Sequence, residues 1–133
     1  MRGASFLDTN VLVYFAQRER TRFDRAAELL ESGCVISVQV LNEFVNVSRN
    51  KFKREWHDVH EALDLIRTLA DVSPLDIVSH ERALTLAERH NFHIYDATIV
   101  AAAIEAGCST LYTEDMHHGM LVDGRWRIVN PFG

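Results

Sequence analysis

The sequence has few cysteines and prolines, with two of each among its 133 residues. Cys34 and Cys108 are too far apart to form a closely spaced metal-binding pair, and two cysteines do not make a disulfide framework. We therefore expect both thiols to be reduced and buried as small hydrophobic groups. No linker, repeat or low-complexity segment divides the chain, so we expect one domain over residues 1–133.

Long hydrophobic runs are also missing. No apolar stretch approaches the roughly 20 residues that a membrane-spanning helix needs. The N-terminal segment lacks the layout of a signal peptide, because Asp8 and Asn10 fall where an apolar core would stand. The composition, 47% hydrophobic and 25% charged, is typical of a globular protein. Together with the reduced cysteines, these features predict a cytoplasmic protein.

The charge is unevenly distributed. The net charge of −5 argues weakly against nucleic-acid binding. However, residues 1–54 carry nine Lys/Arg against six Asp/Glu, whereas residues 55–133 carry five against thirteen. The first part holds two basic clusters, which are candidate phosphate contacts or else solvated surface: Arg18, Arg20, Arg22 and Arg25, then Arg49, Lys51, Lys53 and Arg54.

Four carboxylates stand in apolar surroundings: Asp8, Glu43, Asp96 and Asp115. Burying an unpaired carboxylate is costly, and two such charges about 4 Å apart repel by roughly 4 kcal/mol at an effective dielectric constant near 20. A divalent cation removes this repulsion. The sequence therefore predicts a metal site at these four acids.

Short apolar segments alternate with amphipathic ones. We expect strands at residues 4–7, 34–36, 71–73, 109–113 and 127–129. We expect six helices. The first covers residues 11–17 and is capped by Asn10, the second begins at a Thr21–Asp24 capping box, and the third begins after a Ser37 cap. The others cover residues 55–70, 79–89 with Ser79 as its cap, and 95–106. This alternation predicts an α/β sandwich with a short, largely parallel sheet. Ligands of such sheets bind beyond the carboxyl ends of the strands, where Asp8 and Asp115 are expected.

Four motifs carry a family resemblance. Asp-Thr-Asn at 8–10, Leu-Asn-Glu-Phe at 41–44, Tyr-Asp-Ala at 95–97 and Thr-Glu-Asp at 113–115 occur in order along the chain. Together they resemble the motifs of PIN-domain nucleases, and the compact chain resembles a VapC-type toxin of a toxin–antitoxin pair. The resemblance implies the PIN three-layer sandwich, in which helices flank the sheet.

The resemblance implies that the four acids bind Mg²⁺ or Mn²⁺, Glu43 either directly or through water. It also implies that metal-activated water cuts RNA, leaving 5′-phosphate and 3′-hydroxyl ends. Thr9, Asn10 and Thr113 are expected to orient the acids or water, with helix capping and strand-end hydrogen bonding as equal alternatives. Glu114, next to Asp115, is expected to be exposed, with a role in the outer shell of the metal site as the alternative. The sequence offers no side-chain nucleophile with a plausible base, which favours water over covalent catalysis.

Substrate and partners follow from the same resemblance. It implies an endoribonuclease acting on transfer or ribosomal RNA, a cognate antitoxin whose C-terminal segment enters the active-site groove, and a homodimer. The candidate contacts to the RNA backbone are Arg18, Arg22, Arg49, Lys51, Lys53 and Arg54. His57 and His60 are more simply a solvated helix face than metal ligands, and His117–His118 more simply a polar loop than a substrate contact.

Other functions remain open. The chain is alternatively a PIN nuclease that is not a toxin, or a catalytically silent protein-binding PIN module, although a silent module has no need of four costly acids. A phosphotransfer enzyme is less consistent with the motifs. A haloacid-type phosphatase needs Asp-x-Asp where Asp8–Asn10 stands, and a response receiver needs a lysine after a later strand.

Overall fold

The computed structural model describes residues 5–116 and 118–133, and a mixed sheet of six strands forms its centre. The strand order is β3–β2–β1–β4–β6–β5, and all neighbours are parallel except β5 and β6. The strands are β1 Ser5–Leu7, β2 Cys34–Ser37, β3 Ala70–Ser73, β4 Thr110–Tyr112, β5 Leu121–Val122 and β6 Trp126–Val129. The largely parallel sheet is as predicted.

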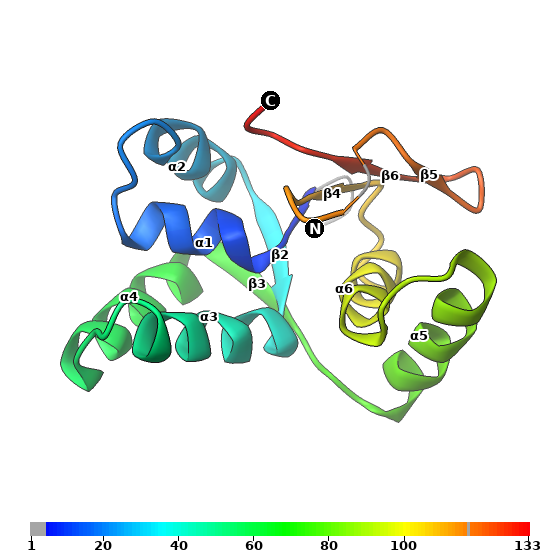
Figure 1. The fold of residues 1–133 in the computed structure, drawn as a ribbon, viewed down its shortest axis with the longest axis horizontal. Coiled ribbons are helices and arrows are strands. Elements are labelled where there is room, and N and C mark those ends of the chain that lie inside the picture. The colour runs from blue at the N-terminus through cyan, green and yellow to red at the C-terminus, as the bar shows by residue number, and fades with distance from the viewer. Residues whose placement is uncertain (1–4, 117) are drawn as a thin grey trace.

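Helices flank the sheet on both sides. Helices α1 to α4 lie on one side, and α5 and α6 pack together on the other (Figure 1). Their bounds are α1 Thr9–Ala16, α2 Phe23–Glu31, α3 Val38–Asn50, α4 Trp56–Leu69, α5 Ile77–His90 and α6 Ile94–Glu105. The largest fully buried side chains, including Phe6 from β1 and Phe44 from α3, belong to one hydrophobic core that both helical layers cover. The three-layer α/β sandwich is therefore confirmed.

Several helix starts differ from the sequence prediction. The side chain of Asp8, not that of Asn10, caps α1 by accepting a hydrogen bond from the backbone N–H of Thr9. Thr21 forms no capping box, because its N–H and hydroxyl both donate to Glu19. The start of α2 at Phe23 consequently has no side-chain cap.

The prediction that Ser37 caps α3 is confirmed, since its hydroxyl accepts from the Val40 N–H at 3.2 Å. The matching prediction for Ser79 is wrong. Asp76 caps α5 and accepts hydrogen bonds from both the N–H and the hydroxyl of Ser79, which is buried inside the first turn. The carboxylate is the better acceptor at an N-terminus that carries partial positive charge.

Both cysteines are free and buried, as the sequence predicts. Burial raises the pKa of the Cys34 thiol to about 11, so that thiol stays protonated at neutral pH. In the parts of the chain that the structure describes, no helix has the length and apolar composition needed to cross a membrane.

The parallel strands position the site. Asp8 follows β1 directly, and its N–H donates to the Tyr112 carbonyl at the end of β4. Thr113, which follows Tyr112, donates its own N–H to the Val129 carbonyl at the end of β6. The carboxyl ends of β1, β4 and β6 thus form one edge, where loops and helix N-termini meet.

Candidate active site

Asp8 is the buried centre of the site. Its side chain is only 4% exposed. One carboxylate oxygen accepts the Thr9 N–H at 2.7 Å, and the other accepts the Thr113 hydroxyl, also at 2.7 Å. Both carboxylate oxygens are thus held by groups at the ends of two adjacent strands, which fixes the orientation of the carboxylate.

The environment of Asp8 is unfavourable for a lone negative charge. Burial raises the pKa of Asp8 to about 6, although the hydrogen bonds from Thr113 and Thr9 lower it. The charges of Glu43 and Asp115 raise this pKa further. Those two acids are therefore close enough to Asp8 to act on it through space, and a cation among them would relieve the repulsion.

Glu43 is held from two sides on α3. Its Oε1 accepts the Thr9 hydroxyl at 2.9 Å, and its Oε2 accepts the amide of Gln39, one turn earlier, at 2.7 Å. Thr9 therefore contacts two of the acids, Asp8 through its backbone and Glu43 through its side chain. Sequence reasoning missed Gln39, although its i, i+4 spacing from Glu43 on a helix would have identified it.

Asp115 is held by Asn10 and Thr113. The Asn10 amide nitrogen donates to Asp115 at 3.0 Å, and the Asp115 N–H donates to the Thr113 hydroxyl oxygen at 3.1 Å. Because that hydroxyl also donates to Asp8, Thr113 connects two acids directly. The side-chain carbonyl oxygen of Asn10 is buried without a hydrogen-bond partner among the described residues, so it is free to accept one.

Asp96 approaches from the other helical layer, in the first turn of α6. Burial raises the pKa of Asp96, neighbouring His93 lowers it, and the charges of Asp115 and Glu43 raise it again. The last two influences link Asp96 to Asp115, in the loop after β4, and to Glu43, on α3 in the other helical layer. The structure thus brings all four predicted acids to one edge of the sheet.

The prediction that all four acids are buried is wrong. Only Asp8 is buried, whereas Glu43 and Asp96 are half-buried and Asp115 is exposed. The reason is their position. Asp8 lies between the ends of two central strands, but the other three lie on helix faces and a loop that border an open edge. The electrostatic argument for a cation therefore rests most strongly on Asp8.

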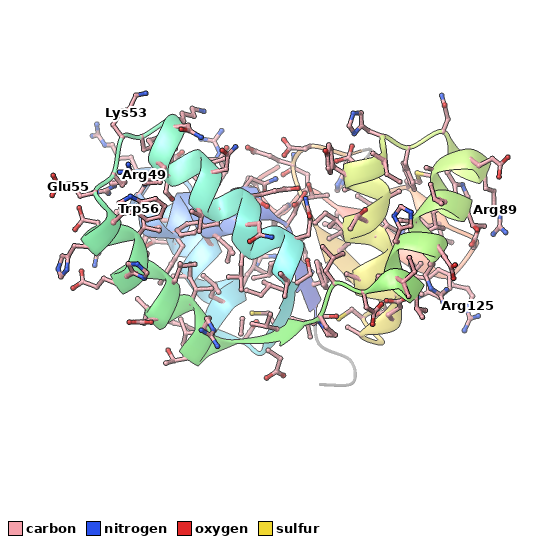
Figure 2. All side chains as sticks on the ribbon, turned by 90° about the horizontal axis from the view of Figure 1, so that it is seen from below. Arg49, Lys53, Glu55, Trp56, Arg89 and Arg125 are labelled. Carbon is pink, nitrogen blue, oxygen red and sulfur yellow. The ribbon has the colours of Figure 1, made fainter. Side chains whose placement is uncertain are left out.

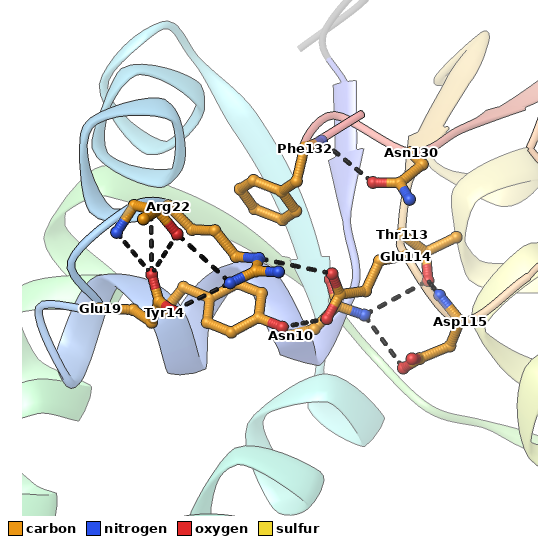
Figure 3. Close-up of polar contacts among 10 residues, drawn as sticks. Asn10, Tyr14, Glu19, Arg22, Thr113, Glu114, Asp115, Asn130 and Phe132 are labelled. Atoms are coloured by element: carbon orange, nitrogen blue, oxygen red, sulfur yellow. Dashed lines mark hydrogen bonds and ion pairs between the residues drawn. The ribbon is translucent and has the colours of Figure 1, made fainter.

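The prediction that Glu114 is exposed is wrong, because its side chain is held by two neighbours. It accepts a hydrogen bond from the Tyr14 hydroxyl of α1, and the guanidinium of Arg22 lies 3.8 Å from its other oxygen (Figure 3). Burial and this carboxylate raise the pKa of Tyr14 to about 12. Arg22 also stacks over the Tyr14 ring, and Phe132 meets the ring edge-on at 5.1 Å between centroids. These contacts anchor the segment that carries Asp115.

The predicted RNA contacts have different surroundings. Arg22 is bound to Glu19 as well as Glu114, and Arg54 donates twice to the Gln17 side chain at the end of α1. The other four are partly or fully accessible: Arg18, Arg49, Lys51 and Lys53. The first three each lie over an aromatic ring, that of Phe23, Trp56 and Phe52 respectively. His57 and His60 are exposed on α4, and His117 lies outside the described residues.

The donor set suits a hard cation. All four acids offer only oxygen, which Mg²⁺ and Mn²⁺ prefer, and Asp8 has the buried, repelled charge that such an ion would neutralise. Within residues 5–116 and 118–133, no group of three or more His, Cys, Asp or Glu side chains is arranged to hold a metal ion. What fits such an ion is thus the chemistry of the donors and the buried charge of Asp8, not a metal site already formed.

Comparisons with known proteins identify the fold. A family model described as the PIN domain matches residues 5–118. No curated protein sequence matches the chain. Among solved structures, the sarcin-ricin loop cleaving toxin VapC20 of Mycobacterium tuberculosis is 20% identical with a TM-score of 0.68, covering 84% of this chain and 91% of that one.

Two further structures are similar over nearly their full length. A toxin–antitoxin complex from Klebsiella pneumoniae contains a chain that is 22% identical with a TM-score of 0.71, with coverage of 96% of this chain and 97% of that one. The DNA-bound VapBC of Salmonella typhimurium is 18% identical with a TM-score of 0.65 and the same coverage. At these identities the likeness concerns the fold.

Proposed function

This chain belongs to the PIN domain family, and from that premise we propose that it is a metal-dependent endoribonuclease, the toxin of a type II toxin–antitoxin pair. The observation that carries the proposal is the environment of Asp8. A buried carboxylate, whose pKa is raised to about 6 and which is repelled by Glu43 and Asp115, is stabilised best by a divalent cation.

The residues that would hold Mg²⁺ or Mn²⁺ are Asp8, Glu43, Asp96 and Asp115. When bound, the ion supplies a water of lowered pKa and neutralises charge on the scissile phosphate. The protein's own hydrogen bonds orient three of the four acids. Thr113 and Thr9 orient Asp8, Thr9 and Gln39 orient Glu43, and Asn10 orients Asp115.

The proposed reaction is hydrolysis of an RNA phosphodiester. The water oxygen bonds to phosphorus as the bond to the 3′ oxygen breaks, which leaves a 5′-phosphate and a 3′-hydroxyl. A cluster of four acids repels the phosphates of RNA, so the basic residues of the first part of the chain are needed to hold the substrate. The proposed substrate class is structured RNA, either transfer or ribosomal, and the sarcin-ricin loop cleaved by the Mycobacterium tuberculosis toxin supports this choice.

The proposed partner is an antitoxin. The toxin–antitoxin complexes of Klebsiella pneumoniae and Salmonella typhimurium, which share this fold, support it. We expect a C-terminal antitoxin segment to place an arginine among the four acids, where its positive charge would take the place of the metal ion and block the site. A homodimer in the cytoplasm, built from one domain per chain, completes the proposal.

The proposal is tested with protein freed of any antitoxin and incubated with labelled RNA. Cleavage in Mg²⁺ or Mn²⁺, its abolition by EDTA and recovery on adding excess Mg²⁺ would support it. The new ends should carry a 5′-phosphate, which ligation to an adaptor detects. Cleavage that continues in EDTA, or that leaves 2′,3′-cyclic phosphates, would rule out the proposed chemistry.

A further inference from the structure

The connection between α3 and α4 presents aromatic rings beside basic groups. Trp56 is 54% exposed and Phe52 is 38% exposed. The guanidinium of Arg49 lies 4.5 Å from the centre of the Trp56 ring, and the Lys51 ammonium lies 5.4 Å from that of Phe52. Arg49, Lys53 and Trp56 gather at one end of the molecule, far from Arg89 and Arg125 at the other (Figure 2). We call Arg49, Lys51, Phe52, Lys53 and Trp56 the α3–α4 platform.

Hydrogen bonds hold the platform in place. The N–H groups of Lys51 and Phe52 both donate to the Val47 carbonyl, and the N–H of Arg54 donates to the Ser48 carbonyl. The Arg49 guanidinium donates to the Arg54 carbonyl at 2.6 Å, which fixes it against Trp56. Because these contacts form without a ligand, little conformational entropy is lost when a ligand binds.

The charge of the platform favours a polyanion over a protein. Residues 49–56 carry four basic side chains against one acid, Glu55. Lysine is depleted at protein–protein interfaces, whereas lysine and arginine beside aromatic rings are typical of single-stranded nucleic-acid sites. The first two turns of α4 that follow carry two exposed acids, Asp58 and Glu61, which would repel RNA from that end of the helix.

Helix α3 connects the platform with the acids. Glu43, Asn46 and Asn50 share one face of this helix, and the two asparagines are exposed and hydrogen-bonded to each other. Arg49 lies six residues after Glu43, or about 9 Å along the axis at 1.5 Å per residue. About three stacked nucleotides span that length at roughly 3.4 Å each. The uncharged side-chain amides of Asn46 and Asn50, on the same face of α3 as Glu43, offer hydrogen bonds to ribose and phosphate.

We propose that the α3–α4 platform binds an unpaired stretch of the RNA substrate, a few nucleotides from the bond that is cut. A base stacks on Trp56, whose ring is backed by Arg49, and a neighbouring base stacks on Phe52. Lys51 and Lys53 contact the phosphates. This inference rests on the proposed function for the identity of the ligand, and it assigns binding of single-stranded RNA to aromatic side chains.

The test measures binding in EDTA, where no cleavage occurs, so its result does not depend on nuclease activity. The probe is a short fluorescein-labelled oligoadenylate, used single-stranded or annealed to oligouridylate. Trp56→Ala should weaken single-strand binding about tenfold, in line with the loss of one stacked base, and should leave duplex binding unchanged. Trp56→Phe should restore most of the affinity.

Tryptophan fluorescence supplies a second readout. The sequence contains two tryptophans, Trp56 and Trp126. In a Trp126→Phe background, oligoadenylate should quench the remaining Trp56 emission to saturation, because a stacked base quenches indole. The matched control is Arg125→Ala, which removes an arginine that stacks on Trp126 in the same way but at the far end of the molecule. This variant should bind like wild type.

If wild type and Trp56→Ala bound the single strand with equal affinity, the proposed role of the platform would be overturned. The same would hold if anisotropy showed a complex to be formed while the Trp56 fluorescence was not quenched. Either result is distinct from a failure of the proposed function. That failure would appear as absent cleavage in Mg²⁺ while oligoadenylate still binds and quenches Trp56.

Discussion

The Thr113 hydroxyl donates a 2.7 Å hydrogen bond to the Asp8 carboxylate and joins the ends of β4 and β1. Thr113 is fully buried, and its oxygen also accepts the Asp115 N–H. A single hydroxyl therefore orients two of the proposed metal ligands.

Thr113→Val should weaken metal binding by about 10- to 100-fold, as expected when a group that orients a ligand is lost. The substitution keeps the side-chain volume but removes the hydrogen bond that lowers the pKa of Asp8. Titration with Mn²⁺, followed by calorimetry, measures the effect. Thr113→Ser retains the hydroxyl and should stay close to wild type. Equal affinities for all three proteins would show that this hydrogen bond plays no part in metal binding.

Asp8 should make the metal-free protein less stable as the pH rises. Its pKa is about 6 in the folded state and 3.8 ordinarily, so between these values the folded state keeps a proton that the unfolded chain has lost. The free energy of unfolding falls through that window, by about 3 kcal/mol in all. Above it, both states are ionised and the loss is complete.

Asp8→Asn isolates this effect, since other groups also titrate. Urea unfolding in EDTA should show the variant gaining stability over wild type as the pH rises from 3.8 to neutrality. Asp64→Asn, at an exposed position on α4, is the control for removing a carboxylate that is not buried. A pH-independent difference for Asp8→Asn would mean that Asp8 is not repelled as described. Mg²⁺ should stabilise wild type and not Asp8→Asn.

Tyr14→Phe should lower the free energy of unfolding by about 1 kcal/mol, the cost of one hydrogen bond. The ring keeps its contacts with Arg22 and Phe132, while Glu114 loses the hydrogen bond that the Tyr14 hydroxyl donates. Chemical denaturation measures the change. The control is Tyr112→Phe on β4, for which we expect little effect. In wild type, one tyrosine should resist ionisation up to about pH 12 in an ultraviolet titration.

Substitutions of Arg54 and Lys53 should have separate effects, the first on stability and the second on RNA binding. Arg54 joins the α3–α4 connection to Gln17, so Arg54→Ala should lower the melting temperature by a few degrees, the effect of roughly 1 kcal/mol. Lys53 is exposed, and Lys53→Gln should leave stability unchanged but flatten the salt dependence of RNA binding by about one counterion. The reverse assignment of these effects would contradict the contacts seen here.

The sequence was sufficient to predict the layers, the parallel sheet and the meeting of the acids. Strand ends and helical spacing are local patterns, and they placed Asp8 after a strand and Glu43 on a helix. The cap choices failed because neighbouring residues competed. Asp8 and Asn10 are both good N-cap residues, as are Asp76 and Ser79, and only the backbone geometry decides between them.

The contacts of Glu114 were beyond local reasoning. Its partners Tyr14 and Arg22 lie on or before helices about a hundred positions earlier in the chain, and no periodic pattern links them. The exposure of Asp115 also differs from the prediction. Apolar neighbours in sequence indicated burial for Asp115, but the loop after β4 turns its side chain to the open edge.

Cleavage of labelled RNA by Asp96→Asn, compared with wild type and Asp64→Asn in Mg²⁺, tests the central claim most directly. The substitution preserves shape and removes one of four mutually repelling charges, so the fold should be kept, as circular dichroism would verify. We predict that Asp96→Asn loses cleavage by at least about 100-fold, comparable to the loss of a key catalytic group, while Asp64→Asn cleaves like wild type. Full activity in a folded Asp96→Asn protein would contradict the four-acid metal site.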